Sequence, residues 1–439
     1  MKKVLASCVV LAVIGCSGGD GGGTGGGSAS TGGGSNGTGG GGGSTATGGG
    51  SGTGGGGGTG GGAAGGTVMP VPTELIGLSA GYTNTCAVLA NKTAKCWGRN
   101  NAGQLGIGMM DFNDHETPAE VMGLTTVEQI SVGYEHVCAV LTDRTGRCWG
   151  VNTNGQLGDN SKTQSSVPVT VTGLSNVASI HAGVSISCAV HVDGTVSCWG
   201  RGGELGDNGV TESLVPRVVP GLANVTQLSI APNAGSTTTI HVCGVRSDGT
   251  AFCWGNGAAG AGGSGTQTTT RAPTPVVGPG DAGITDAAEI TAGGTHGCMR
   301  RAAGVSCWGF SQQVGDGTIN QSLVAVPVDA GTLNLVAIEA GNDQTLARTS
   351  TNSLVCWGRN GRGQCGDSAA FTPSGPIYLA PVATTTMEVS LFTLGGSHGC
   401  AYQPGPRVTW CWGATDWGAL GFPTEQFVSR LSVPDFVRW

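Results

Sequence analysis

The chain has 439 residues, of which 86 are glycine, and its formal net charge is −7. Lys and Arg together number 20 and form no basic run in the repeats described below, so the clustered cationic surface that nucleic-acid binding needs is not expected. Most of the glycine lies early, and residues 68–439 are enough for one large domain with a substantial core.

The first sixteen residues have the pattern of an export signal. Lys2 and Lys3 precede an apolar stretch, 4–14, that is too short to span a bilayer as a mature helix. Residues 13–16 (Val-Ile-Gly-Cys) resemble a bacterial lipobox, in which the signal peptidase cuts before the cysteine and the cysteine is acylated. We therefore expect a signal peptide at 1–15 and a lipid on Cys16 that attaches the protein to the membrane. The alternative is an ordinary cleaved signal. Ser17 is compatible with sorting to the outer membrane of the cell envelope.

The next segment, 16–67, consists almost only of Gly, Ser, Thr and Ala after the cysteine. Such a composition has no apolar surface to offset the entropy of ordering, which predicts a flexible tether. At about 5–6 Å × √n, some fifty residues give a mean span of roughly 40 Å. This reach suits a domain, 68–439, that is held at a membrane by the lipid alone.

A Cys-Trp-Gly triplet organises the rest of the chain. Successive triplet cysteines are 52, 50, 55, 54, 49 and 55 residues apart, and a period near 50 indicates a repeat architecture. The seven triplets begin at Cys96, Cys148, Cys198, Cys253, Cys307, Cys356 and Cys411.

Each unit predicts four short strands. An apolar run that ends in Ala-Gly or a variant, such as 76–81, is followed by a second run containing Cys-Ala-Val or similar. A hairpin turn comes next, clearest at Asp193-Gly194, and the third run ends in Cys-Trp-Gly. A polar loop such as 155–159 leads to a run containing proline, which predicts an edge strand. The prolines of these runs are Pro118, Pro168, Pro216, Pro275, Pro327, Pro376 and Pro434.

Four-stranded antiparallel sheets repeated radially form a β-propeller, and no long amphipathic helix pattern competes with this prediction. The succession Ala-Gly, His-x-Cys-Ala-Val, Asp-Gly, Cys-Trp-Gly and Gly-Gln-Leu-Gly-Asp resembles the regulator of chromosome condensation repeat family. The resemblance covers residues 75–439 and implies an all-β, seven-bladed propeller. We also expect the last run, 433–439, to join the sheet of the first unit, with Phe436 and Trp439 sealing the ring, because open sheet edges are avoided.

The fourteen cysteines of the repeats predict disulfides. Pairs 9–11 residues apart would face each other across a hairpin, within bridging distance, and an exported chain meets oxidising conditions. The sixth unit lacks its first cysteine and has Cys365 in its loop instead, which suggests a replacement bridge. Zinc is the alternative, although no short Cys-x₂₋₄-Cys knuckle occurs. The expected pairs are Cys86–Cys96, Cys138–Cys148, Cys188–Cys198, Cys243–Cys253, Cys298–Cys307, Cys400–Cys411 and Cys356–Cys365.

Other repeated side chains are better explained by structure than by chemistry. Four histidines (His136, His241, His296 and His398) stand two residues before a hairpin cysteine, where a hydrogen-bonded structural role is favoured over metal binding. The triplet tryptophans are expected in blade cores. Aspartates that follow Leu-Gly or its equivalent (Asp159, Asp207, Asp316 and Asp367) are expected to stabilise turns and not to bind calcium.

These features favour a binding protein over an enzyme. No catalytic motif with a suitable context occurs, no cofactor is implied, and propeller loops can vary while the blades stay fixed. We expect a monomeric, lipid-anchored scaffold of the cell envelope that recognises a protein or a glycan. The alternatives are an envelope enzyme with a site at the channel mouth, or an inhibitor of an exported enzyme. Nucleotide exchange on a small GTPase, known in the family, is disfavoured because an exported protein would not meet that partner.

Overall fold

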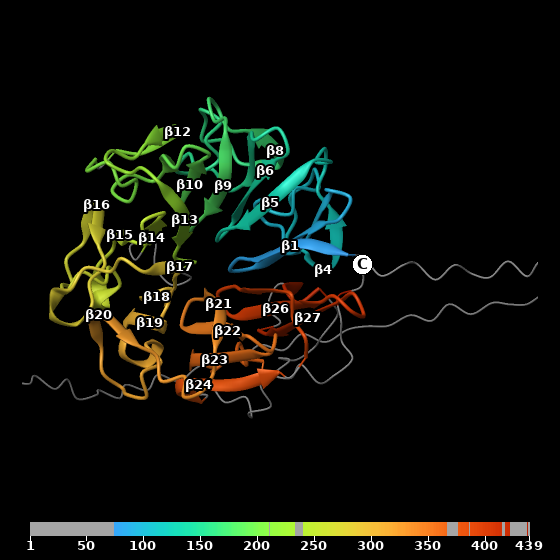
Figure 1. Cartoon of the computed structure of the whole chain (residues 1–439). Helices are drawn as coiled ribbons and strands as arrows, with labels where there is room; N and C mark the ends of the chain where they lie inside the picture. The colour runs from blue at the N-terminus through green and yellow to red at the C-terminus, as the bar shows by residue number, and fades with distance from the viewer. Residues whose placement is uncertain are drawn as a thin grey trace, which may run out of the picture. The chain divides into compact units, whose positions relative to one another are not determined.

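The computed structural model describes residues 74–209, 211–232, 240–366, 376–385, 387–414, 418–421 and 437. The signal peptide and the glycine-rich linker lie outside these ranges. Within them the chain forms seven antiparallel sheets, six of four strands and a seventh of which three strands are described. The sheets form a ring in chain order, with the first strand of each sheet towards the centre and the fourth at the perimeter (Figure 1).

The strands of successive blades occupy equivalent places. The inner strands are β1 (Leu75–Ala80), β5 (Val127–Val132), β9 (Val177–Ala182), β13 (Val225–Ile230), β17 (Ala287–Ala292), β21 (Leu335–Ala340) and β25 (Leu391–Leu394). The second strands are β2 (Asn84–Leu89), β6 (His136–Leu141), β10 (Ile186–His191), β14 (His241–Arg246), β18 (His296–Arg301), β22 (Gln344–Thr349) and β26 (His398–Gln403).

The third strands carry the Cys-Trp-Gly triplets, and the fourth strands contain or directly follow the predicted prolines. The third strands are β3 (Ala94–Arg99), β7 (Gly146–Gly150), β11 (Val196–Gly200), β15 (Ala251–Gly255), β19 (Gly304–Gly309), β23 (Leu354–Arg359) and β27 (Val408–Gly413). The outer strands are β4 (Asp114–Glu120), β8 (Ser165–Thr170), β12 (Ser213–Val218), β16 (Thr270–Pro275), β20 (Ser322–Pro327) and β24 (Ile377–Thr385). Three short 3₁₀ helices are η1 (Ala258–Gly260), η2 (Pro279–Asp281) and η3 (Ser311–Gln313).

The fold shows why cysteine, tryptophan and glycine recur together in the triplet. Each tryptophan is buried between two sheets; Trp149, for example, packs with Val88 and Leu105 of the preceding blade. Its indole N–H donates to the Gln104 carbonyl of that blade over 2.9 Å. The glycine that follows, Gly150, has a φ of 104°, and a Cβ there would lie 2.4 Å from the Glu135 carbonyl oxygen. Only glycine fits such a site, so Cys-Trp-Gly recurs as a unit.

Seven disulfide bridges reinforce the blades, and they join the seven expected pairs. Six link the second and third strands of one blade directly across the hairpin. The seventh, Cys356–Cys365, ties β23 to the loop that follows it, because Leu346 stands opposite Cys356 in the ladder. All these cysteines are at most 3% exposed.

The expected mode of ring closure is wrong at Val437, the one residue of the run 433–439 that the structure describes. Val437, the described residue of the terminal run, donates its N–H to Thr409 O in β27 (3.1 Å) and so belongs with the last blade. The residue that follows the outer strand makes the same bond in five other blades, as Val121 does to Ala94 O. The ring is closed by contacts between the last and first blades, including a bond from Trp97 Nε1 to Ala419 O (2.9 Å). Phe436 and Trp439 lie outside the described residues.

Candidate functional site

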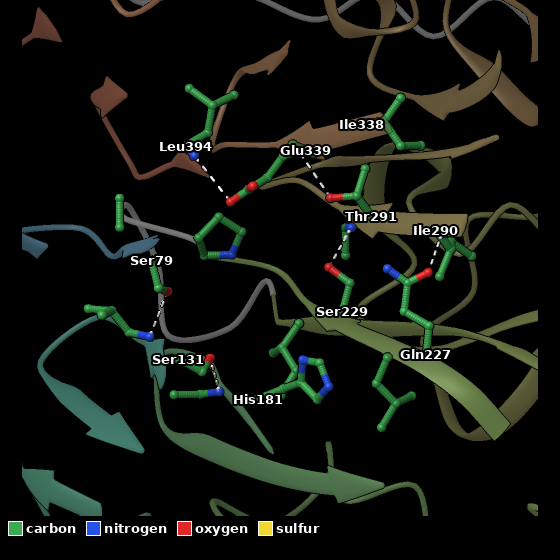
Figure 2. A pocket seen from close by; sticks show the side chains of 18 of the residues that line it. Ser79, Ser131, His181, Gln227, Ser229, Ile290, Thr291, Ile338, Glu339 and Leu394 are labelled. Carbon is green, nitrogen blue, oxygen red and sulfur yellow. Dashed lines mark hydrogen bonds between the residues drawn. The ribbon is translucent and has the colours of Figure 1, made fainter. Parts of the chain in front are cut away.

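The ends of the seven inner strands surround a central cavity of about 280 Å³. Because the strands of each blade form an antiparallel meander, the loops after first and third strands share one face, here called the mouth face. The hairpins between second and third strands lie on the opposite face, here called the hairpin face. Figure 2 shows polar side chains from different blades around the cavity, among them Ser79, Ser131, Ser229, Thr291 and Glu339.

These side chains form a belt of hydrogen bonds from blade to blade. The side chain of the penultimate residue of an inner strand accepts a hydrogen bond from the last backbone N–H of the next inner strand. In the first joint, Ser79 Oγ accepts from Val132 N–H over 3.0 Å. An inner strand is the edge of its sheet, so this bond caps an N–H group that would otherwise lack a partner. The acceptors of the six joints that contain this bond are Ser79, Ser131, Ser229, Thr291, Glu339 and Thr393.

The joint between the third and fourth blades is the exception. His181 takes the acceptor position there, and its Nε2 lies 3.0 Å from Ser179 Oγ in its own strand. Burial lowers the pKa of His181 to about 4, so the ring is neutral at physiological pH. In the next blade, Gln227 Oε1 accepts from Ile290 N–H (2.9 Å), which leaves the Gln227 amide group directed to the cavity. The cavity therefore offers neutral donors on this side.

Two carboxyl groups lie in the same cavity, and both serve as joints. Glu339 Oε1 accepts from Thr393 Oγ1 (2.8 Å) and from Leu394 N–H (3.1 Å). Burial raises the pKa of Glu339 to about 7 although these hydrogen bonds lower it. Glu289 Oε1 accepts from Ile338 N–H, and Glu289 Oε2 accepts from Arg300 Nε. With these bonds the two carboxyls hold neighbouring strands together, and they do not form a free acid–base pair.

The histidines singled out in the sequence are in the walls between blades, away from the central cavity. His136 Nε2 lies 2.9 Å from Ser187 Oγ, and Ser187 Oγ donates its own proton to Gln156 O. The imidazole must then donate from Nε2 and is the neutral Nε2–H tautomer. Burial lowers the pKa of His136 to about 3, in agreement with this neutral state. The hydrogen-bonded structural role is thus confirmed for His136.

Two further histidines repeat this arrangement. His296 Nε2 lies 2.8 Å from Thr345 Oγ1, and His398 Nε2 lies 2.8 Å from Thr85 Oγ1. Burial lowers the pKa of His296 to about 3 and that of His398 to about 4. His241 is also buried in its blade wall, but the next blade has Gly297 where the others have a hydroxyl.

Sequence reasoning missed these partners, yet a signal was present. Ser or Thr immediately before the first hairpin-cysteine position occurs in three units, at Thr85, Ser187 and Thr345. Around the ring, the unit before each of these three has a histidine two residues before its own first hairpin cysteine. The residue pairs are therefore complementary between successive units, which a search within one unit does not detect.

The aspartates after Leu-Gly stabilise turns where the structure describes them. Asp159 Oδ1 accepts from Ser161 N–H (3.1 Å), and Asp316 Oδ1 accepts from Thr318 N–H (3.0 Å). Asp207 accepts from Gly209 N–H (2.8 Å), whereas Asp367 lies outside the described residues. Among the described residues, no three His, Cys, Asp or Glu side chains gather as they would around a metal ion.

Among the described residues, an exposed apolar loop lies on the mouth face, between β3 and β4. Met109, Met110 and Phe112 are 54%, 40% and 90% exposed. The backbone beneath them is held in place, because Asn100 Nδ2 donates to Met109 O (3.1 Å) and Gly108 N–H donates to Ser166 O of the next blade (2.9 Å). We call these three residues the apolar loop. Large exposed apolar side chains on a fixed backbone are typical of interaction surfaces.

A second feature of the mouth face is a pair of stacked tyrosines. The rings of Tyr82 and Tyr134 are nearly parallel, with centroids 4.9 Å apart. Tyr82 also lies against Gly396 of the last blade, where an added Cβ would be 2.1 Å from the ring. The stacked rings thus join the first and second blades, and Tyr82 also contacts the last blade.

Comparison with known proteins identifies the repeats. Residues 96–140 and 148–190 match a family model described as the regulator of chromosome condensation (RCC1) repeat, and residues 76–104, 127–156 and 335–364 match a second model with the same description.

Curated relatives share only part of their length with this chain. The human probable E3 ubiquitin-protein ligase HERC6 is 34% identical over 95 residues, which are 21% of this chain and 9% of that protein. The ultraviolet-B receptor UVR8 of Arabidopsis thaliana is 30% identical over 92 residues, 20% of each chain. The matched segment thus spans a fifth or less of these relatives.

Solved structures match over most of the propeller. Prp20p of Saccharomyces cerevisiae superposes with a TM-score of 0.65 and 19% identity, covering 82% of this chain and 86% of that one. Human WBSCR16 gives a TM-score of 0.63 with 22% identity, covering 75% and 86%. At such identities the likeness shows the fold. The fold is thus a seven-bladed propeller, and the matched segments of the chain are similar to regulator of chromosome condensation repeats.

Proposed function

We propose that this protein is an exported binding propeller, held in the cell envelope by a lipid on Cys16, that recognises a protein partner through its mouth face. The observation that carries the binding role is the apolar loop, Met109, Met110 and Phe112, which is exposed although its backbone is hydrogen-bonded to the blades. Methionine and aromatic side chains are enriched in protein interfaces.

Export is supported by the seven disulfide bridges, since such bridges persist in oxidising compartments. No helix in the described part of the chain is long and apolar enough to cross a membrane. In this proposal the lipid on Cys16 attaches the protein to the envelope, and the glycine-rich linker, 16–67, gives the propeller its reach.

Recognition by propellers of this kind has precedent. Prp20p is described with binding properties to Gsp1p and histones, and the same yeast protein has been crystallised bound to Kap60. A protein partner is favoured over a glycan here, because the exposed side chains of the apolar loop lack the hydrogen-bonding groups that sugars need. An inhibitory contact with an exported enzyme is one form that such binding takes.

The binding role is tested with a triple variant, Met109→Ser, Met110→Ser and Phe112→Ser, in the otherwise intact protein. Proteins crosslinked to it in cell envelopes are compared with those crosslinked to the wild type. The matched control is Val192→Ser, which removes a 56% exposed apolar side chain from a turn on the hairpin face. We expect the triple variant to lose partners that the control keeps. If both variants retain the same partners, the apolar loop is not the binding site.

Anchoring is tested separately by Cys16→Ser. This variant should incorporate no labelled fatty acid and should not be cleaved by the lipoprotein signal peptidase. Labelling equal to that of the wild type would contradict the lipid anchor, whatever the outcome at the apolar loop.

A further inference from the structure

The hairpin face contains a bond that recurs between neighbouring blades. The hairpin turn of one blade offers a backbone carbonyl to the N–H group at the start of the next inner strand. Val225 N–H donates to Gly194 O over 2.9 Å, and Ala287 N–H donates to Gly249 O over 3.0 Å. We call this bond the latch. The acceptors at the five joints that have it are Lys92, Arg144, Gly194, Gly249 and Asn352.

Hairpin length decides whether the latch forms. In the five blades that provide a latch, the facing positions of the second and third strands are ten residues apart, as in Cys243–Cys253. The last hairpin is one residue longer, and there Arg407 pairs with Glu74 at 3.7 Å instead. The fifth hairpin is one residue shorter, with Cys298 and Cys307 nine apart, and in the described chain no bond joins it to Leu335.

The shortening leaves a hollow. Arg301 pairs with Gly304 in the ladder, so the fifth hairpin turns through Ala302 and Ala303 alone. Between this tight turn and the loop that follows β20 lies a groove of about 430 Å³. Leu335 and Val305 are buried in its floor, and Leu333 at its rim is 41% exposed.

The groove also contains a backbone donor. At the five joints that have a latch, the N–H at the position equivalent to Leu335 points away from its own sheet and bonds to the hairpin turn of the preceding blade. Leu335 has the same register at the start of β21 and is only 6% exposed, so its N–H faces the groove. A buried N–H without an acceptor is costly, and an incoming carbonyl that accepts from it gains that energy.

We propose that this groove is a peptide-binding site that takes an exposed turn of a partner chain. The occupant is defined by what the five joints with a latch contain: a backbone carbonyl that accepts from the inner-strand N–H, followed in the chain by Thr or Ser. The groove supplies the rest, with apolar walls from Ala303, Val328 and Leu333. The site is on the hairpin face and is independent of the apolar loop on the mouth face.

The peptide used as a probe copies a hairpin turn of this protein. The blocked peptide acetyl-Ser-Asp-Gly-Thr-amide reproduces the turn 247–250, whose Gly249 carbonyl forms a latch. It is titrated into the full-length protein while amide hydrogen exchange is followed by mass spectrometry. We expect saturable slowing of exchange in the segment that contains Leu335, because the carbonyl covers that N–H.

Insertion of one threonine after Gly304 gives the fifth hairpin the length of the fourth and should close the groove with an internal latch. The inserted variant should show slow exchange at Leu335 without peptide, and its affinity for the peptide should fall at least about tenfold. Leu333→Ser should weaken binding without affecting the fold, whereas Ile319→Ser, at a 70% exposed site elsewhere in the blade, should not. Absence of saturable protection in the wild type, or equal binding by the inserted variant, would overturn the proposal.

Discussion

Acidification should destabilise the propeller through its buried histidines. His136 is neutral in the folded protein, with a pKa lowered by burial to about 3, whereas an unfolded histidine titrates near 6.5. Between these values the unfolded chain binds more protons, so the free energy of unfolding falls as the pH decreases. The contribution is complete above about pH 6.5 and is lost progressively below it.

The magnitude follows from the same values. One pH unit corresponds to about 1.4 kcal/mol for each proton taken up on unfolding, so at pH 4.5, two units below the unfolded pKa, His136 alone costs about 2.7 kcal/mol. His296 and His398 have pKa values of about 3 and about 4 and add similar amounts. Glu339 acts in the opposite direction, because its raised pKa of about 7 makes the folded protein bind the extra proton. The three histidines outweigh this single carboxyl.

The assay is equilibrium urea unfolding between pH 7.5 and 4.5, with disulfides intact. His136→Gln is a suitable perturbation, because Gln344 occupies the equivalent position in the sixth blade. Between pH 6 and 4.5, the slope of the free energy of unfolding against pH should be smaller in this variant than in the wild type by about 1.4 kcal/mol per pH unit. Ser187→Ala is the control: it removes the hydrogen-bond partner and lowers stability at neutral pH, but the slope remains because the histidine stays buried. An unchanged slope in His136→Gln would refute the reasoning.

Three further changes test the packing of the ring. Thr393→Val removes the acceptor for Ala80 N–H and the donor to Glu339, and should cost about 1–3 kcal/mol in urea unfolding because buried polar groups lose partners; a cost near zero would show that the belt adds no stability. Gly150→Ala places a Cβ 2.4 Å from a carbonyl oxygen at a φ of 104° and should lower stability by at least about 1–3 kcal/mol, whereas an unaltered melting temperature would contradict the backbone geometry. Val437→Asp introduces a charge at a 2% exposed site beside β27 and should lower the melting temperature sharply, unless this residue is not packed there.

Much of the fold could be predicted from the sequence because the residues that recur in each unit are fixed by covalent and steric constraints. Cys-Trp-Gly marks a bridge, a buried ring and a backbone position that excludes side chains, so seven triplets predict seven blades. The loss of one hairpin cysteine and the gain of Cys365 also predicted the replacement bridge, since a disulfide needs both partners.

The central cavity could not be predicted in the same way. Ser79 and Thr291 alternate with apolar residues, as surface residues of any strand do, and nothing within one unit shows that they face the N–H of the next. Ring closure failed for a related reason. The avoidance of open sheet edges predicts that 433–439 joins the first sheet, whereas the N–H of Val437 bonds to Thr409 O in the last blade.

The belt of hydrogen bonds between inner strands gives a physical reason why the two proposed binding sites lie on a loop and beside a hairpin. Every inner strand is a sheet edge, and its outward N–H groups need acceptors. In six joints a side chain of the preceding blade provides an acceptor. The joint between the last and first blades uses the same bond as the others: Thr393 accepts from Ala80 N–H as Ser79 accepts from Val132 N–H. A substitution at these positions therefore changes the joint between blades as well as the cavity surface. The side chains of the β3–β4 loop and of the fifth hairpin turn take no part in these inner-strand bonds, so the loop can acquire exposed methionines and the hairpin can lose a residue while these bonds remain.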